Sequence, residues 1–259
     1  NFSPPARNAA LDDAVQARVK ADYPARREAS RQSLMGVPAE MSGQATRTLA
    51  PEVLRERLER LWAEGGALTF VAAFPDILAD AQANQAVAEF VRDKIRAVVK
   101  DPQVADMLCP DTHPIGTKRL CLDTEYYETF NRPNVTLVDL RRTPIERITP
   151  AGVRTTQHEY PLDVLIFATG FDAMTGALLA MDIRGRTGQG LRTAWTDGPQ
   201  TYLGLATAGF PNLFLITGPQ SPSVFSNMVV SIEQHVDWIA DCIAHLRARG
   251  AAAIEARAD

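Results

Sequence analysis

Hydrophobic positions in the first 110 residues recur at helical spacing. Four apolar residues spaced by four, Leu11, Val15, Val19 and Tyr23, mark one side of the first predicted helix. Pro24 should end or kink this helix, because proline lacks a backbone N–H and cannot continue the hydrogen-bond ladder. The first part of the chain is therefore predicted to be helical.

Two further helices are predicted before residue 110. Pro51 suits the first position of one of them, and the pair Gly65–Gly66 should end it. Asn84 is predicted to cap the next helix, which Asp101-Pro102 should end. Its inward side is expected to carry Val87, Phe90, Val91, Ile95 and Val98. Residues 33–48 lack periodicity and predict a loop.

After about Pro110 the pattern changes to short β-type runs separated by turn signals. The expected strands are Val135–Val138, Ile145–Ile148, Val153–Thr155, Val164–Phe167 and Asn212–Thr217. A last helix is expected over about Ser226–Arg249, with Gly250 as its stop. Its inner side should carry Met228, Ile232, His235, Val236, Ile239, Ile243 and Leu246. A helical block thus precedes an α/β block.

The amino-acid composition argues against some classes of function but does not indicate a particular one. Of 259 residues 46% are hydrophobic and 22% are charged, which is ordinary for a globular protein. The formal net charge of −4, without a basic stripe, argues against a nucleic-acid partner. Prolines and glycines break the uncharged stretch from Gly198 to Ile232, so we expect no membrane span there. The chain begins with Asn and shows no signal peptide, so we expect a piece of a longer or processed protein.

Cysteine and histidine spacing indicates no metal site. Cys109, Cys121 and Cys242 are odd in number and form no CxxC pair, which excludes a disulfide framework and favours a reducing cytoplasm. No histidine has a carboxylate or cysteine at metal-ligand spacing. His235 falls on the inner side of the last predicted helix and is interpreted as a satisfied core residue.

The stretch DVLIFATGFDAMTG, Asp163 to Gly176, joins an apolar run to a point with almost no side-chain bulk. Gly170 can adopt a positive φ and lets a flat cofactor approach the main chain at Ala168-Thr169-Gly170. Asp172 could accept hydrogen bonds from sugar hydroxyls or backbone amides. A plain strand-to-loop transition, with Asp172 as a turn residue, explains the spacing equally well.

Two other stretches carry candidate chemistry. In IGTKRL, Lys118 could hold a phosphate and Arg119 a developing anion, although surface cations are the simpler interpretation. In GPQSPSVFSNM, Ser226 and Asn227 can cap the last helix, whose free amides would face an anion or an electron-rich ring. An ordinary loop is the alternative there. The glycine-containing stretch Gly185–Gly190 has a spacing similar to that of a dinucleotide-binding motif. It does not follow a clear predicted strand, and it is interpreted as a surface hairpin.

Taken together, these stretches resemble a known family. PIGTKRLCLDTEYYETFNRPNVTLVDL, DVLIFATGFDAMTGAL, DIRG, GPQTYLGLATAGFPNLFLITGPQSPSVFSNM and SIEQHVDWI are similar to Baeyer–Villiger monooxygenases of the phenylacetone and cyclohexanone monooxygenase type. The helical stretches NFSPPARNAALD and ANQAVAEFVRDKIRAVVKDPQVADML resemble the helical insertion of that family. The resemblance covers essentially the whole chain, and its motifs match in order.

The resemblance implies an α/β fold: part of a flavoprotein with two Rossmann-like dinucleotide-binding domains and an α-helical insertion. It implies FAD and NADP as cofactors, and a bacterial enzyme that converts a ketone to an ester or lactone with NADPH and O2. The expected parts are a helical insertion at 1–115, part of the NADP-binding domain at 116–162, and the C-terminal part of the FAD-binding domain at 163–259.

The resemblance also assigns residues. Arg119 would be the catalytic arginine that stabilises the negative peroxyflavin, and Lys118 would hold the NADP 2′-phosphate. Thr169, Gly170 and Asp172 would lie where the chain crosses into the FAD domain, and Met228 would lie beside the flavin. The substrate pocket would be lined by Ser223, Val224 and Phe225, where Phe225 replaces a residue that is often a smaller aliphatic in the family.

The family's Gly-rich motifs and the aspartate partner of its arginine would lie upstream of Asn1, and a tryptophan that contacts NADP would lie after Asp259. We therefore expect the isolated segment to be inactive, as a truncated product or a helical interaction module. A second alternative is another flavin monooxygenase reaction, N-hydroxylation or sulfoxidation. The accepted ketone and the oligomeric state are not encoded in these motifs.

Overall fold

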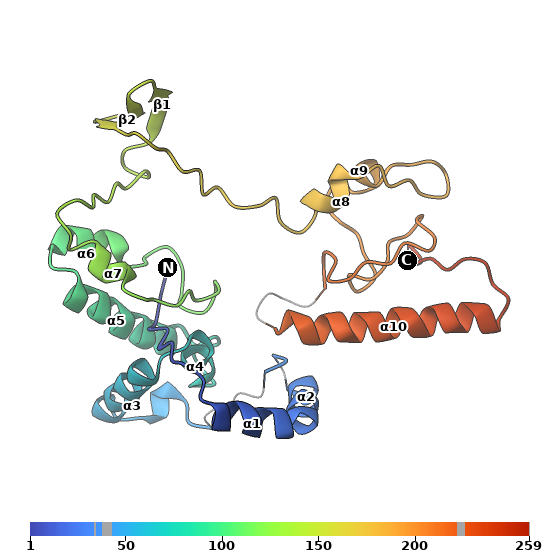
Figure 1. Cartoon of the computed structure of the whole chain (residues 1–259), viewed down its shortest axis with the longest axis horizontal. Helices are drawn as coiled ribbons and strands as arrows, with labels where there is room; N and C mark the ends of the chain where they lie inside the picture. Colours follow the sequence, from blue (N-terminus) through green and yellow to red (C-terminus); the bar gives the residue numbers. More distant parts are fainter. Residues whose placement is uncertain (34, 38–42, 222–225, 259) are drawn as a thin grey trace. The chain divides into compact units, whose positions relative to one another are not determined.

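The computed structural model describes residues 1–33, 35–37, 43–221 and 226–258, and Figure 1 follows the chain along them. Contacts divide the chain into two units. Unit 1 comprises Asn1–Val15 and Ala39–Phe167, and unit 2 comprises Gln16–Pro38 and Ala168–Asp259. Each unit is described by itself below.

Unit 1 consists of helices around one apolar core, followed by a small sheet. Its elements are the 3₁₀ turn η1 (Thr46–Thr48), α3 (Pro51–Glu64), α4 (Ala67–Ala72), α5 (Ala81–Val98), α6 (Pro102–Leu108), α7 (Tyr126–Thr129), β1 (Ile145–Thr149), β2 (Gly152–Thr155) and β3 (Glu159–Pro161). Pro51 begins α3 and Gly65 is its C-cap, as the sequence predicted. Helix α6 was not predicted; it begins at the same Pro102 that was expected only to end the preceding helix.

Helix α5 is the centre of this core. Its inward residues Val87, Phe90, Val91 and Ile95 are buried, which confirms the predicted helix face. Phe70 and Trp62 pack edge-on, with ring centroids 5.9 Å apart, and both rings lie within 6.5 Å of the Phe90 ring. Burying a side chain of this size contributes roughly 1.5–3 kcal/mol, so this aromatic contact is a main source of stability.

The predicted cap of α5 was wrong. Asp80, not Asn84, begins the helix, because its carboxylate accepts hydrogen bonds from the backbone N–H groups of Gln82 and Ala83. Asn84 lies one turn inside the helix and is buried. Its side chain is used for contacts with other segments, described with the candidate site.

The first predicted helix is divided in two. Helix α1 (Asp13–Ala21) ends before Pro24, and Pro24 lies in the first turn of α2 (Tyr23–Gln32). Proline is compatible with that position because a first-turn N–H has no partner in the helix. The apolar side predicted for these residues is only partly covered: Val15 and Val19 are half-buried, whereas Leu11 is 69% and Tyr23 55% exposed.

The sheet of unit 1 is antiparallel, with strand order β1-β2-β3. Two of its strands match the predicted runs at Ile145 and Val153, and β3 was not predicted. The other three predicted runs, Val135–Val138, Val164–Phe167 and Asn212–Thr217, form no strand in the part of the chain that the structure describes. An apolar run becomes a strand only when its backbone N–H and C=O groups pair with a neighbour.

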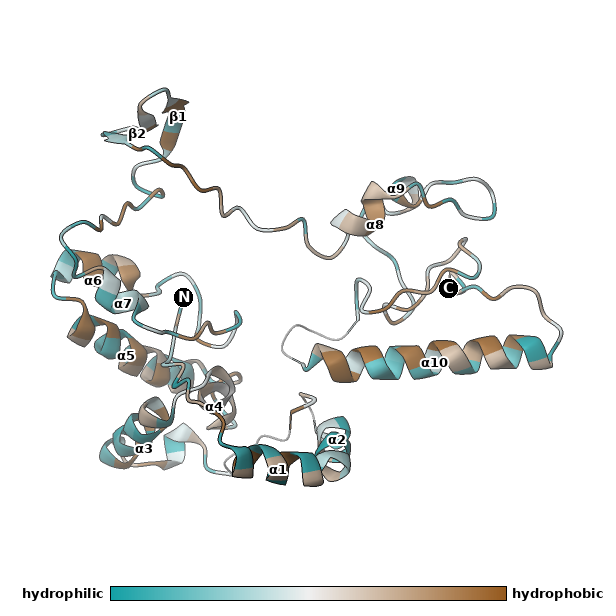
Figure 2. Ribbon diagram, viewed as in Figure 1, coloured by the Kyte–Doolittle hydropathy of each residue, from teal (hydrophilic) through white to brown (hydrophobic). Residues whose placement is uncertain are grey.

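The segment after the sheet shows this clearly. Val164 is 73% exposed and Ile166 is 83% exposed, although Figure 2 colours the stretch as hydrophobic. The sequence pattern is that of a buried strand, yet no partner strand lies among residues 1–33, 35–37, 43–221 and 226–258.

Unit 2 has a small core and one long helix. Its elements include α2, α8 (Gly176–Ala180), α9 (Leu191–Ala194) and α10 (Met228–Ala248). Leu191, Trp195, Phe210 and Leu215 form its buried cluster. The predicted hairpin is confirmed, since Arg184 pairs with Gly190 and the Gly185 N–H donates to Gln189 O at 2.9 Å.

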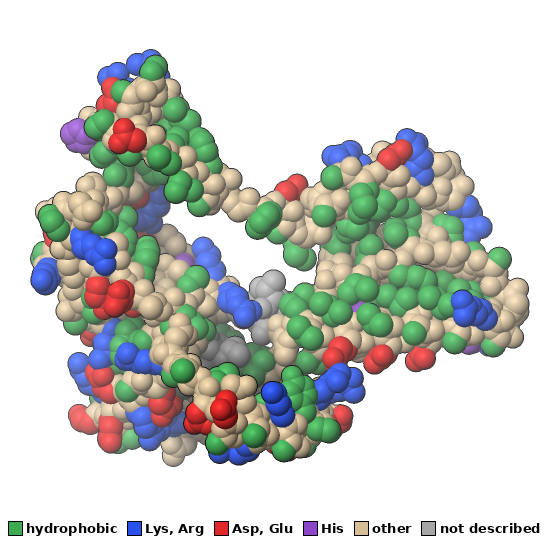
Figure 3. All heavy atoms as spheres, viewed as in Figure 1, with side chains coloured by type: hydrophobic (Ala, Val, Ile, Leu, Met, Phe, Trp, Pro, Cys, Tyr) green, Lys and Arg blue, Asp and Glu red, His purple; other side chains and the backbone are tan. Residues whose placement is uncertain are grey.

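Helix α10 is where the last helix was predicted, but three of the residues of its predicted inner side, Ile232, Val236 and Ile243, are exposed. Within the described helix His235 is the buried residue, whereas Val236 is 45% exposed. Figure 3 shows hydrophobic side chains gathered along α10 on the face in view. Among the described residues, no helix is both long enough and apolar enough to cross a membrane.

Candidate functional site

The predicted basic pair lies on a short exposed segment between two buried anchors. Ile115 and Leu120 are buried, while Lys118 and Arg119 between them are exposed. A turn begins the segment: the Thr117 side chain and backbone N–H both donate to Pro114 O, at 2.8 and 3.3 Å. The two cations are therefore presented to solvent from a backbone that is fixed on either side.

Asn84 holds the first anchor. Its Nδ2 donates to Ile115 O at 2.8 Å and to Ile77 O at 3.0 Å, and its Oδ1 accepts from the Ile115 N–H at 3.1 Å. All three partners are backbone groups that would otherwise be buried without a hydrogen bond. The sequence analysis missed this role, and the one available signal was a polar residue among the inward positions of an amphipathic helix.

The start of the chain holds the other end of the segment. Asn1 Nδ2 donates to Arg119 O at 2.9 Å. The Asp123 N–H donates to Pro4 O and the Ala6 N–H donates to Asp123 O, each at 2.9 Å. Residues 1–6 thus lie beside residues 119–123 and fix the main chain at Arg119 directly.

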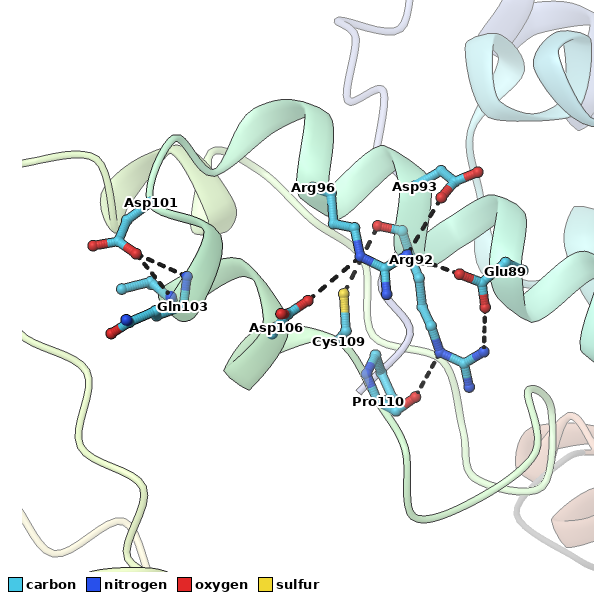
Figure 4. A network of polar contacts seen from close by, with 10 residues as sticks. Glu89, Arg92, Asp93, Arg96, Asp101, Gln103, Asp106, Cys109 and Pro110 are labelled. Atoms are coloured by element: carbon cyan, nitrogen blue, oxygen red, sulfur yellow. Dashed lines mark hydrogen bonds and ion pairs between the residues drawn. The ribbon is translucent and has the colours of Figure 1, made fainter.

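A polar network joins α5 and α6 where the chain leaves toward this segment (Figure 4). Arg96 lies 2.8 Å from Glu89 and 3.5 Å from Asp106, while Arg92 donates to Glu89 at 2.9 Å and to Pro110 O at 2.9 Å. The hydrogen bond from Arg96 holds the pKa of Glu89 below its usual value. The network therefore fixes Pro110, five residues before the anchor Ile115.

Two titratable side chains near this segment, Cys109 and His113, have shifted pKa values. Burial raises the pKa of the Cys109 thiol, which favours the uncharged form. Burial also lowers the pKa of His113, and the positive charge of Lys118 lowers it further. The field of Lys118 thus reaches His113, whose ring packs edge-on against Phe2 at 5.6 Å. The lowered pKa of His113 favours the neutral imidazole.

The Ala168-Thr169-Gly170 stretch begins the second segment of unit 2, and Thr169, Gly170 and Asp172 are all exposed. Gly170 has φ +81°, which confirms the predicted positive φ. No atom lies within 4 Å of the position that a Cβ would occupy there, so the backbone conformation and not crowding requires glycine. The Asp172 carboxylate lies against Gly176 at the start of α8, where a Cβ would be 2.5 Å from the Asp172 Cγ.

The third stretch reaches α10. Asn227 is the N-cap and its Oδ1 accepts from the Val229 N–H at 3.1 Å, which confirms the predicted cap. Met228 is the first residue of α10 and is half-buried. Ser223, Val224 and Phe225, predicted to line a substrate pocket, lie outside the described residues.

His235 is confirmed as a satisfied core residue. It is 2% exposed, and its Nδ1 accepts a hydrogen bond from the Thr217 N–H at 3.0 Å. Nδ1 therefore carries no proton, and burial lowers the pKa of His235. Thr217 has φ +52°, an uncommon conformation for this residue, and the bond from α10 holds it there.

The candidate residues form two sets. Lys118 and Arg119 lie in unit 1, and Thr169, Gly170, Asp172 and Met228 lie in unit 2. Within the described part of the chain, no group of three or more His, Cys, Asp or Glu side chains gathers as a metal site would require. The chemistry available is that of two fixed cations in one unit and of an open, glycine-containing loop and a capped helix start in the other.

The chain is similar to several known proteins. No protein-family model matches the chain. It is 41% identical over 261 residues to a cyclopentanone 1,2-monooxygenase of Comamonas sp. (strain NCIMB 9872), covering all of this chain and 48% of that protein. It is also 41% identical over 244 residues to a phenazine N-monooxygenase, PhzNO1, of Lysobacter antibioticus, covering 93% of this chain and 44% of that protein. The chain thus spans about half the length of the relatives it matches.

A solved structure agrees with the relatives. The crystal structure of OTEMO in complex with FAD and NADP is 38% identical with a TM-score of 0.92, over 96% of this chain and 47% of that one. The fold is therefore that of part of a two-cofactor α/β flavoprotein with a helical insertion, as predicted. The chain is related along its length to the Baeyer–Villiger monooxygenases, and the resemblance stated from the sequence is confirmed.

Proposed function

We propose that the protein that carries this chain is a Baeyer–Villiger monooxygenase, which uses FAD, NADPH and O2 to convert a ketone to an ester or lactone. One observation carries the proposal: Lys118 and Arg119 are exposed cations on a segment that Asn84, Asn1 and Pro114 hold from three sides. Two neighbouring cations on an exposed segment with a fixed backbone suit a site for anionic groups.

The residues present fit parts of a dinucleotide site. Lys118 offers a compact positive charge that suits the 2′-phosphate of NADP, and Arg119 offers a fixed fork of donors. Gly170, with φ +81° and open space around it, allows a close approach of FAD to the main chain at Thr169, and Asp172 offers acceptors to sugar hydroxyls. When bound, the flavin would supply the redox chemistry that activates oxygen with electrons from NADPH.

Arg119 is assigned the catalytic role. Arginine carries a positive charge with several donors, so Arg119 would stabilise the negative charge that develops while oxygen is transferred to the ketone. The fixed backbone at Arg119 reduces the reorganisation that this stabilisation requires. Met228 is assigned a place beside the flavin ring, and Ser223, Val224 and Phe225 are assigned to the ketone pocket on the resemblance alone.

The proposed domain boundaries follow the same resemblance: a helical insertion at 1–115, part of the NADP-binding domain at 116–162 and part of the FAD-binding domain at 163–259. We place the protein in the cytoplasm, where its three free cysteines would stay reduced. Neither nucleic acid nor a membrane is proposed as a partner. The activity is assigned to the longer protein and not to residues 1–259 in isolation.

The test separates flavin reduction from oxygen transfer. In the FAD-loaded protein, Arg119→Ala should leave NADPH-dependent bleaching of the flavin within a few-fold of the wild type and lower ester formation by on the order of 10²–10³-fold. Arg142→Ala is the matched control, because Arg142 is an exposed arginine of the same unit. Ester formation by the Arg119→Ala variant at the wild-type rate would exclude the assigned role.

N-Oxygenation is the second candidate, and the relationship to a phenazine N-monooxygenase favours it as strongly by identity as the cyclopentanone relative favours ketone oxidation. Incubation of the FAD-loaded protein with cyclopentanone and with phenazine, in parallel and with NADPH in excess, distinguishes the two. Lactone from the first and no N-oxide from the second supports ketone oxidation. The reverse result moves the assignment to N-oxygenation.

A further inference from the structure

The start of α10 is joined to the segment that follows α2. The Asn227 N–H donates to Met35 O at 2.8 Å, and Asn227 Nδ2 donates to Gly36 O at 3.1 Å. With its Oδ1 the same side chain caps α10 through the Val229 N–H. One residue thus serves both as the helix cap and as the link to a segment about 190 residues earlier in the chain.

Gly36 is fitted to this contact. It has φ +66°, which favours glycine, and a Cβ there would lie 2.9 Å from the Asn227 Cβ and 3.3 Å from the Asn227 nitrogen. The Gly36 N–H in turn donates to Ser33 O at 3.2 Å, which ties the contact to the end of α2. We call these two residues, Gly36 and Asn227, the joint.

Ion pairs extend the joint along both helices. Glu233 of α10 accepts from Arg27 at 2.6 Å and from Arg31 at 3.3 Å, both on α2. The hydrogen bond from Arg27 is the main reason why the pKa of Glu233 is lowered. The pairs are partly exposed, so they orient α2 along α10 more than they stabilise it.

Apolar packing does not fix this contact. Open hollows of about 580 and 500 Å³ border it, and Asn227 and Val230 line both. Where side chains leave such space, directional hydrogen bonds decide the position of the helix start.

We infer that Asn227 is a positioning residue, whose amide link to Gly36 lets the segment after α2 fix the start of α10 and with it Met228, the residue assigned to the flavin ring. This inference rests on the proposed function, because a flavin must lie beside Met228 for its position to matter. Gly36, which lies in the proposed helical insertion, would then help to set the position of the start of α10 in the proposed FAD-binding part.

Asn227→Asp isolates the link from the cap. Aspartate keeps the oxygen that accepts from the Val229 N–H, and its negative charge suits a helix N-terminus, but it cannot donate to Gly36 O. Gly36→Ala breaks the same joint from the other side. Thr196→Ala is the control: it removes an exposed side-chain hydrogen bond to Thr193 O just after α9, in the same unit and remote from the joint in sequence.

Hydrogen exchange by mass spectrometry tests the joint without reference to flavin. In the full protein, the Asn227 amide should exchange about 5-fold faster in Asn227→Asp, the factor for one lost hydrogen bond, while the Val229 amide keeps its protection. Unchanged exchange at Asn227 overturns the joint. Should Gly36→Ala fail to fold, Asn227→Asp carries the test, because it removes no packing.

Coupling of NADPH consumption to product tests the positioning. In both joint variants the fraction of NADPH electrons lost to hydrogen peroxide should rise about 10-fold, with FAD content and the KM for NADPH within about 2-fold of the wild type. Thr196→Ala should leave this fraction unchanged. Faster exchange with unchanged coupling overturns the positioning role. A wild-type protein that neither holds FAD nor oxidises NADPH refutes the proposed function instead, and the exchange result still decides whether the joint holds α10.

Discussion

Replacing Asn84 with alanine tests whether a buried amide holds the segment that carries Lys118 and Arg119. The variant removes three hydrogen bonds, to Ile77 O, Ile115 O and the Ile115 N–H. Each contributes about 0.5–1.5 kcal/mol net, and a buried backbone group left without a partner costs about 1–3 kcal/mol. Alanine returns about 0.5 kcal/mol because it is the better helix former. We expect the free energy of unfolding to fall by about 2–4 kcal/mol.

Urea unfolding followed by far-ultraviolet circular dichroism measures this loss. With an m-value of about 2 kcal/mol/M, the midpoint should fall by about 1–2 M urea. Gln82→Ala is the matched control, because Gln82 is exposed on the same helix and only its backbone N–H contacts the Asp80 cap. A midpoint for Asn84→Ala equal to that of Gln82→Ala would refute the reasoning, since the three hydrogen bonds would then contribute nothing to the free energy of unfolding.

Asn84→Asp sharpens the test. The carboxylate keeps the acceptor for the Ile115 N–H but faces the two carbonyl oxygens to which the amide donated. Burial and this repulsion should raise its pKa, so the unfolded state releases its proton first and stability falls as pH rises through the folded-state pKa. Asn84→Asp should therefore be closest to the wild type in acid, where its protonated carboxyl group can donate one hydrogen bond.

Two other groups give pH-dependent predictions. Because burial lowers the pKa of His235, the unfolded state binds more protons between that lowered value and about 6.5, so stability should be complete above about pH 6.5 and fall below it. His235→Asn, which can still accept from the Thr217 N–H, should reduce this fall in urea titrations at several pH values; an unchanged fall would assign it to other groups, of which His113 is the first. Burial raises the pKa of Tyr127 to about 12, so an ultraviolet titration should show one of the five tyrosines ionising near that pH. Tyr127→Phe should abolish that step, and its persistence in the variant would contradict the assignment.

Helix prediction succeeded where the signal was local. The start of α3 at Pro51, its end at Gly65 and the cap of α10 at Asn227 each depend on a few adjacent residues and their backbone conformations. The cap of α5 failed for an instructive reason. Asp80 and Asn84 are both good caps, and what excluded Asn84 was the position of Ile115, 31 residues later, which no local pattern contains.

Strand prediction failed where a partner was required. Val164–Phe167 has the residues of a buried strand, but strand formation depends on hydrogen bonds to another segment. The same limit applies to α10, whose apolar side the sequence identifies but whose covering partner it does not. The three short motifs, by contrast, were enough to indicate the family. Their order along the chain matches that of the family, and this order can be read without knowledge of their contacts.

The amino-acid sequence by itself determined the helix ends at Pro51, Gly65 and Asn227, the presence of the basic pair and the kinship, since each resides in the identity and order of neighbouring residues. Only the tertiary structure decided that Asn84 and Asn1 hold the main chain at Ile115 and Arg119, and that Gly36 meets Asn227 across 191 positions. The physical reason is that such hydrogen bonds join segments far apart in the chain, and their geometry exists only after the chain has folded.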